Sequence, residues 1–305
     1  MTQRTLLRNI VIGLWGMARP MVMISNILSW LLGVSIAYGS GFGIGVEAVG
    51  YSFIVLILVS ASIHYVNEYA DHETDAFTIR TLYSGGSGVI PRGLVPRSLA
   101  LKSAWAALSI SLLFQLVAVF MGVHPWSASV VLVIGAVGGW MYSLPPLKLG
   151  WQGWGEVDNA FLGSNLLPLY GYVTTSGRFD FWVMLACLPF SFIAFTNLLA
   201  VTWPDRGADA RVGKMTLATL WRPERLRVLN GVVLVASFVL LLALRGWILP
   251  AEVVLASFAA LPLLLWGAMT YTRTRISRAI VYGMMTMMVS QTIAWFSVGM
   301  GLTLT

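Results

Sequence analysis

Two short acidic stretches carry the side chains best suited to chemistry in this sequence. Residues 67–75 read N-E-Y-A-D-H-E-T-D, and residues 203–209 read W-P-D-R-G-A-D. Positions four apart share one face of a helix, so each stretch presents a polar stripe whose repelling carboxylates need a cation nearby. The stripes are Asn67, Asp71 and Asp75 in the first stretch and Asp205 and Asp209 in the second, with Asn197 two turns before Asp205.

The chemistry that these carboxylates favour is Mg²⁺ binding beside a diphosphate. Mg²⁺ prefers oxygen ligands, retains waters, and is usually shared between one or two carboxylates and a phosphate. Two facing aspartate pairs therefore suit Mg²⁺ ions that neutralise a departing diphosphate and ease the breaking of its C–O bond. The alternative is a pair of solvated helix ends neutralised by Arg80 or Arg206, which explains one aspartate better than two matched pairs.

Two neighbouring segments could complete a diphosphate site. The loop at residues 83–96 is rich in glycine, which lets backbone N–H groups approach phosphate oxygens, and Arg80 adds charge beside it. Residues 142–148 read Y-S-L-P-P-L-K and follow an apolar run. Lys148 could contact a diphosphate as a point charge, while Tyr142 offers an aromatic face to a developing carbocation.

Three polar residues after Lys148 are candidates for binding a second substrate. They are Glu156, Asp158 and Asn165. They could bind a hydroxylated acceptor, or they could simply pair with loop cations; the sequence leaves both interpretations open.

The elements that must position these residues are membrane helices. The chain of 305 residues is 58% hydrophobic and only 10% charged, whereas a water-soluble domain carries about a quarter charged residues. Continuous apolar runs rather than alternating ones favour helices over a barrel. We therefore expect an all-α integral membrane protein, a nine-transmembrane-helix bundle with a central cavity opening to the cytoplasmic side. The nine expected spans are residues 20–39, 46–66, 99–121, 126–142, 157–175, 181–202, 226–244, 251–270 and 280–301.

Basic residues divide unevenly between the predicted loops. All of the nineteen Lys and Arg residues except Arg178 and Arg245 fall on one side, which predicts a cytoplasmic amino terminus. Both acidic stretches lie on this same face. The net charge of +7 thus reflects topology and an anionic substrate or lipid, and we expect no nucleic-acid partner.

The spacing of the aspartates indicates an internal repeat. Asp71 and Asp205 are 134 residues apart, as are Asp75 and Asp209, and four helices intervene. We therefore expect residues 1–305 to form a single membrane domain. Within it, spans 1–4 and 5–8 would be a degenerate duplication, followed by span 9, with the site at the junction of the repeats.

Taken together, the motifs resemble those of the UbiA superfamily of intramembrane prenyltransferases over nearly the whole chain. That family shows N-x₃-D-x₃-D after its second span, Y-S-x-P-P after its fourth, and D-x₃-D followed by G-K-x-T-L-A after its sixth. The same order occurs here at residues 67–75, 142–146 and 205–218. The resemblance implies that Asn67, Asp71, Asp75, Asp205 and Asp209 bind a Mg²⁺–diphosphate and that the basic residue near Y-S-L-P-P contacts it.

Two positions depart from the family pattern. Val201 stands where the family often has asparagine, which leaves Asn197 as a substitute. Only Lys148 follows Y-S-L-P-P, so diphosphate binding is expected to depend more on Arg80, Arg211 or Lys214.

The resemblance implies transfer of a polyprenyl group from a polyprenyl diphosphate to an aromatic acceptor. Residues 85–91 (GGSGVIP) and 153–156 (GWGE) look like the menaquinone branch, whose acceptor is 1,4-dihydroxy-2-naphthoate. Acceptors such as 4-hydroxybenzoate, homogentisate or a glycerol-phosphate lipid stay open, as does a membrane terpene cyclase.

An alternative from a different class is a secondary ion transporter. It is disfavoured because transporters generally place their acids near the middle of the bilayer. The short loops and the lack of a presequence indicate a multi-pass protein of a prokaryotic inner membrane. Nothing in the sequence indicates its oligomeric state.

Overall fold

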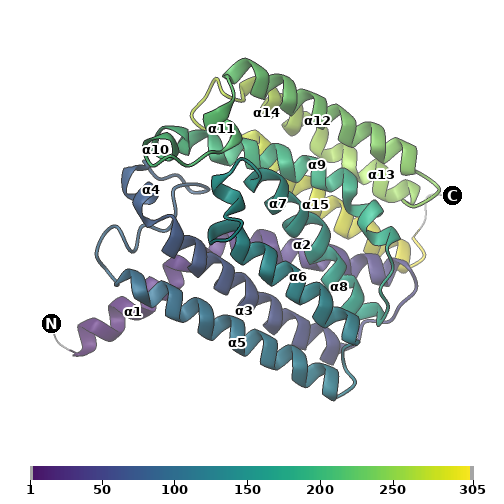
Figure 1. Ribbon diagram of the computed structural model, residues 1–305. Coiled ribbons are helices and arrows are strands. Elements are labelled where there is room, and N and C mark those ends of the chain that lie inside the picture. The colour runs from purple at the N-terminus through teal and green to yellow at the C-terminus, as the bar shows by residue number, and fades with distance from the viewer. Residues whose placement is uncertain (1–2, 303–305) are drawn as a thin grey trace.

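The structure, a computed structural model, describes residues 3–302 as long helices packed side by side (Figure 1). Eight helical segments in this range are long and apolar enough to cross a membrane. They are Pro20–Gly39, Val46–Ala70, Arg97–Phe120, Trp126–Ser143, Trp182–Arg211, Pro223–Leu244, Ala251–Thr270 and Arg278–Gly299. The all-α membrane class expected from composition is therefore confirmed, since continuous apolar runs form helices that satisfy their own backbone groups.

The bounds of the elements follow the apolar runs closely. In chain order they are α1 (Gln3–Met17), α2 (Pro20–Gly39), α3 (Val46–Ala70), α4 (His72–Phe77), α5 (Arg97–Phe120), α6 (Trp126–Ser143), η1 (Leu149–Trp151), α7 (Gly155–Phe161), η2 (Leu162–Leu166), α8 (Leu167–Ser176), α9 (Trp182–Thr202), η3 (Trp203–Asp205), α10 (Arg206–Arg211), α11 (Leu217–Leu220), α12 (Pro223–Leu244), α13 (Ala251–Ser257), η4 (Phe258–Ala260), α14 (Leu261–Thr270) and α15 (Arg278–Gly299). The helix α1, which precedes the first span, was not expected from the sequence.

The expected fifth span is the one of the nine that is not among the eight long apolar segments. Residues 155–176 are helical throughout, but the run is divided into α7, the π-helical turn η2 and α8. Such π-turns occur within α-helices and often mark functional regions. The nine-span count stays a prediction, because it requires these three pieces to cross the membrane together.

Close packing of α2 against α8 fixes two of the helices that border the site. A Cβ atom on Gly33 would lie 1.8 Å from the carbonyl oxygen of Pro168, and one on Gly171 would lie 2.3 Å from the carbonyl oxygen of Trp30. Only glycine permits so close an approach of two backbones, as is common between membrane helices.

The two acidic stretches end up together at one end of the bundle. Figure 1 shows α4, α10 and α11 gathered at the same end, and α4 packs against α10. Pro204 does not end the helical run, because it occupies the tight turn η3 that leads from α9 directly into α10. Proline is tolerated in the first turn of a helix, where its missing N–H is not needed. The internal duplication of the chain remains a prediction.

Candidate active site

The first aspartates sit where α3 stops and α4 restarts. Asp71 follows the last residue of α3, and its backbone N–H still donates to the carbonyl of Asn67 at 2.9 Å. Asp75 lies within α4, and its backbone N–H donates to the carbonyl of Asp71 at 2.9 Å. Both carboxylates are buried, so each needs a compensating partner.

Lys214 is the residue that joins the two acidic stretches. Its Nζ lies 2.8 Å from Oδ2 of Asp71 and 3.8 Å from Oδ1 of Asp209. Asp71 also accepts hydrogen bonds from Nδ2 of Asn67 at 3.1 Å and from Nε1 of Trp151 at 2.9 Å. One buried ammonium group therefore contacts a carboxylate from each motif, so the two stretches share a single site.

The electrostatics of this site follow from burial and from Lys214. Burial opposes ionisation of Asp71, but the adjacent Lys214 outweighs it and lowers the pKa of Asp71. Burial likewise lowers the pKa of Lys214, but the Asp71 carboxylate outweighs it, and the net pKa lies above its ordinary value. Within residues 3–302 no ion pair to Asp75 is formed, and burial raises its pKa to about 7. A cation placed beside Asp75 would keep it ionised.

The glycine-rich loop closes over both stretches. The backbone N–H of Gly85 donates to Oδ2 of Asp205 at 3.1 Å. Gly86 packs against Asp75 so closely that a Cβ atom there would lie 1.8 Å from Oδ2 of the carboxylate. Two consecutive glycines thus contact one aspartate from each stretch, at φ angles of 83° and 60° that favour glycine.

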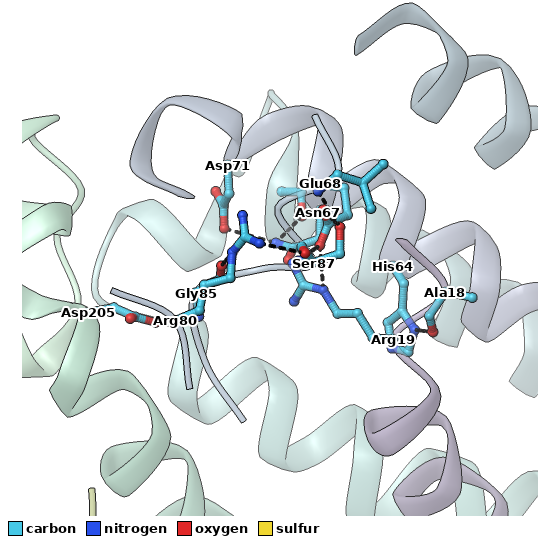
Figure 2. A network of polar contacts seen from close by, with 12 residues as sticks. Ala18, Arg19, His64, Asn67, Glu68, Asp71, Arg80, Gly85, Ser87 and Asp205 are labelled. Carbon is cyan, nitrogen blue, oxygen red and sulfur yellow. Dashed lines mark hydrogen bonds and ion pairs between the residues drawn. The ribbon is translucent and has the colours of Figure 1, made fainter. Parts of the chain in front are cut away.

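A second network ties this loop to α3 and to the start of α2. Figure 2 shows Glu68 accepting from Arg19 and Ser87: Nε of Arg19 lies at 2.7 Å, and the backbone N–H and Oγ of Ser87 lie at 2.8 and 2.5 Å. Nearby, Nδ1 of His64 lies 2.6 Å from the carbonyl oxygen of Ala18. The buried Glu68 therefore holds the loop to the end of α3.

The aspartates, Lys214 and the two loop glycines line a cavity of about 430 Å³, which we call the aspartate pocket. Eight of the residues singled out in the sequence line it: Asn67, Asp71, Asp75, Tyr142, Asn197, Asp205, Asp209 and Lys214. Its apolar walls come from α2, α9 and α15.

The aspartate pocket fits Mg²⁺ by the chemistry of its free oxygens. Oδ2 of Asp75, Oδ1 of Asp205 and Oδ1 of Asp209 are buried without a hydrogen-bond partner in the described part of the chain. Within residues 3–302, no three His, Cys, Asp or Glu side chains are arranged to hold a metal ion by themselves. Carboxylates that keep an oxygen without a hydrogen-bond partner, but are not gathered into a complete cage, suit an ion that takes its other ligands from phosphate and water.

The family of the chain is shown by its sequence. Residues 26–290 match the UbiA prenyltransferase family. This chain is a UbiA prenyltransferase. Direct comparison with curated proteins gives no match. The family expected from the motifs is therefore confirmed, and the chain is an enzyme of that family.

Solved structures show the same fold for this prenyltransferase. A UbiA homolog from Aeropyrum pernix K1 has a TM-score of 0.68 at 12% identity, covering 91% of this chain and 97% of the other. A digeranylgeranylglyceryl phosphate synthase has a TM-score of 0.65 at 15% identity, covering 97% and 99%. A UbiA homolog from Archaeoglobus fulgidus bound to GPP and Mg²⁺ has a TM-score of 0.60 at 16% identity, covering 94% and 99%. None of these findings resolves the menaquinone branch.

Three cations expected to contact the diphosphate lie outside the aspartate pocket of the prenyltransferase. Arg80 donates to the carbonyls of Gly85 at 3.1 Å and Ser87 at 2.8 Å, so its guanidinium shapes the loop. The Lys148 ammonium lies 3.4 Å from the centre of the Trp151 ring. The Arg211 guanidinium lies 5.9 Å from the centre of the Phe77 ring. Of the four expected cations, the structure places only Lys214 beside the aspartates.

The three residues expected to bind the acceptor lie in three different environments. Oε1 of Glu156 accepts from the backbone N–H of Leu217 at 3.1 Å and so fixes α11. Asn165 donates through Nδ2 to Oγ of Ser191 and is buried between helices. Asp158 alone lines a pocket, which adjoins the aspartate pocket.

Several residues of the site escaped the sequence analysis. Arg19 was interpreted only as a topology marker, and Glu68 was counted with the acidic stretch but given no role. Trp151 and Ser87 had no motif to mark them. The one available signal was Glu68 itself, because a carboxylate at the edge of an apolar span usually has a function.

The close approach of Gly86 to Asp75 yields a test of the loop. We expect Gly86→Ala to lower kcat/KM at least about tenfold, because the added methyl group would collide with the Asp75 carboxylate and lift the loop. Gly93→Ala is the matched control: its φ of 68° gives similar strain, but a Cβ atom there meets nothing within 4 Å. Steady-state kinetics of both variants would contradict this role if they lost activity equally.

Proposed function

We propose that this UbiA prenyltransferase transfers a polyprenyl group from a polyprenyl diphosphate to an electron-rich aromatic acceptor, with Mg²⁺ as cofactor. The observation that carries the proposal is the contact of Lys214 with Asp71 and Asp209, beside carboxylate oxygens that lack partners. The homolog from Archaeoglobus fulgidus bound to GPP and Mg²⁺ supports the same substrate class.

The residues that would hold Mg²⁺ are those whose oxygens face the aspartate pocket. They are Asn67, Asp71, Asp75, Asp205 and Asp209. When bound, Mg²⁺ supplies positive charge that stabilises a departing diphosphate. Lys214 adds a fixed positive charge at the same place, and its two carboxylate contacts hold the ammonium in position.

The loop and the helix ends would exclude water from the reacting carbon. Gly85 and Ser87 join the loop to Asp205 and Glu68, so the loop covers the charged end of the pocket. A carbocation formed at the prenyl carbon needs such shelter, and the Tyr142 ring can stabilise it without attacking it.

The prenyl chain would lie along the apolar wall that α9 and α15 provide. Phe190, Leu198, Met284 and Met288 line this wall below the aspartates. Flexible thioethers adapt to a flexible chain. Met21 on α2 also lines the pocket and is 46% exposed, which favours a sideways exit for a long chain into the lipid.

The first acceptor to consider is 1,4-dihydroxy-2-naphthoate, on the strength of residues 85–91 and 153–156. We further propose a prokaryotic inner membrane with the amino terminus and the aspartate pocket on the cytoplasmic side, because the basic loops gather there.

The proposal is tested by an acceptor screen with the purified protein. Incubation with geranylgeranyl diphosphate and Mg²⁺ should give a prenylated product with 1,4-dihydroxy-2-naphthoate, 4-hydroxybenzoate or homogentisate, detected by mass spectrometry. Chelation with EDTA should abolish the product, and added Mg²⁺ should restore it. Formation of a hydrocarbon without any acceptor would instead show a terpene cyclase, and product formation that EDTA leaves unchanged would refute the role of Mg²⁺.

A further inference from the structure

A second pocket adjoins the aspartate pocket and runs between α3, α6 and the α7–α8 segment. We call it the side pocket; it encloses about 200 Å³. Seven residues belong to the linings of both pockets, so the two pockets meet there: Arg19, Val22, Asn26, Asn67, Tyr142, Asn159 and Gly163.

The side pocket is deep for its volume. Its lining extends along α3 from Asn67 to Leu56 and along α6 from Tyr142 to Val131. At a rise of 1.5 Å per residue, each of these paths spans roughly 16 Å. The shape is therefore a slot that leads away from the charged end of the site.

The deep end of the side pocket is fixed by hydrogen bonds. Tyr170 lines it there and donates to Oε1 of Gln115 at 2.7 Å, and Nδ1 of His124 lies 3.1 Å from the same oxygen. A buried network whose members satisfy each other keeps its geometry. Tyr170 consequently acts as a rigid floor that limits what can enter.

The walls of the side pocket are mostly apolar, and its lining includes one carboxylate, that of Asp158. Leu56, Val59, Val131 and Leu132 lie along the slot. Asp158 faces it from α7, and its Oδ2 is buried without a hydrogen-bond partner within residues 3–302. A carboxylate oxygen in such surroundings is stabilised when a hydroxyl group donates a hydrogen bond to it.

The charges at the mouth of the slot do not favour an anion inside it. The Arg19 guanidinium is already engaged by Glu68 at 2.7 Å, and the His64 ring bonds to the carbonyl of Ala18. The carboxylate of Asp158 is the acidic group in the lining of the slot, and its Oδ2 lacks a hydrogen-bond partner among the described residues. An anion is therefore disfavoured in the slot, and because the aromatic acceptors of the proposed function carry no cation, the group that enters is uncharged.

We propose that the side pocket binds the acceptor: an uncharged ring system enters between α3 and α6 and donates a hydroxyl hydrogen bond to Asp158. This inference rests on the proposed function and adds a separate place and a chemical class for the second substrate. A carboxylate on the same acceptor stays at the mouth, outside the slot.

The assignment of the two substrates to two pockets follows from where the diphosphate is held. Asp205, Asp209 and Lys214 line the aspartate pocket alone, and the methionine-lined wall continues from them. The prenyl chain follows that wall, which leaves the side pocket to the acceptor. The reacting ends of both substrates then meet beside Asn67 and Tyr142.

Gly135 offers a way to fill the side pocket without disturbing its walls. It lines the slot on α6, and a Cβ atom there meets nothing within 4 Å. We expect Gly135→Leu to raise the KM for 1,4-dihydroxy-2-naphthoate at least about tenfold, while the KM for geranylgeranyl diphosphate stays within about twofold. Ser25→Leu, which fills only the aspartate pocket, should have the reverse effect.

Two further variants distinguish a loss of acceptor binding from a nonspecific effect of the substitution on the fold. Gly231→Leu on α12 is the matched control, because Gly231 also meets nothing within 4 Å and belongs to neither lining; its kinetics should equal those of the wild type. Asp158→Asn should raise the acceptor KM about tenfold and leave the KM for geranylgeranyl diphosphate unchanged, because the neutral amide accepts a weaker hydrogen bond.

The outcomes distinguish this inference from the proposed function. A rise in the KM for geranylgeranyl diphosphate alone in Gly135→Leu would show that the slot holds the prenyl chain, and unchanged kinetics would show that it holds neither substrate. If the wild type prenylates none of the three acceptors, the proposed function fails. Equilibrium dialysis of 1-naphthol then decides the inference, which stands only if Gly135→Leu loses the binding that wild type and Gly231→Leu retain.

Discussion

Neutralising one aspartate of either stretch, as Asp71→Asn or Asp205→Asn, should lower turnover by at least about a thousandfold, or ~4 kcal/mol of transition-state stabilisation. Each substitution keeps the shape of the side chain but removes a charge that would hold Mg²⁺ against the diphosphate. The measurement is the rate of prenyl transfer at saturating Mg²⁺ by purified protein in nanodiscs.

Glu73→Gln provides the matched control for this loss. Glu73 belongs to the same acidic stretch but is exposed, and its ion-pair contact is with His72 at 3.8 Å. Its neutralisation should change the rate no more than about twofold. Full activity of Asp71→Asn or Asp205→Asn, with insertion into the membrane intact, would refute the assignment of the aspartates.

Lys214→Met should have the second largest effect, because it removes the cation that the two stretches share. Asp71 and Asp209 would then be buried without their cationic partner. Removing one partner of a buried ion pair typically lowers the free energy of unfolding by about 3–5 kcal/mol. We expect a clear fall in Tm without Mg²⁺ and a fall in turnover of about a hundredfold. Added Mg²⁺ should raise the Tm of the variant more than that of the wild type, because the metal replaces the missing charge.

Lys102→Met is the control for Lys214→Met. It changes the same residue type in the first turns of α5, where the side chain is exposed. Its Tm and turnover should match those of the wild type. Thermal melts of both variants with and without Mg²⁺ would contradict the role of Lys214 if Mg²⁺ raised every Tm by the same amount.

The spans could be predicted from the sequence because length and hydropathy decide them. Eight of the nine expected segments correspond to long helical segments in the structure. Most of their ends differ from the expected ones by a few residues at most; the larger differences are that α3 continues to Ala70 and that α9 continues into α10. The exception, residues 157–175, contains the π-turn η2, which no apolar pattern distinguishes from an ordinary helix.

The convergence of the aspartates was predicted from their repeated spacing, and the contacts of Lys214 are consistent with it. Of the four expected cations, only Lys214 lies beside the aspartates, because the position of each cation depends on loop conformation as well as on charge. Lys148 adopts a left-handed backbone with φ of 46° and lies over Trp151, whereas Lys214 reaches Asp71 across 143 residues of sequence. Both contacts depend on how the loops fold, which the motifs around Lys148 and Lys214 do not specify.

The central claim is that both aspartate stretches and Lys214 bind one metal-bound diphosphate. The most direct test is a structure of the protein with Mn²⁺ in place of Mg²⁺ and with geranyl thiolodiphosphate, which does not react. The account predicts anomalous metal density beside Asp71 and Asp75 on one side and Asp205 and Asp209 on the other, with the diphosphate between them and in contact with Lys214. Metal or diphosphate density at any place that contacts only one stretch, or neither, would contradict it.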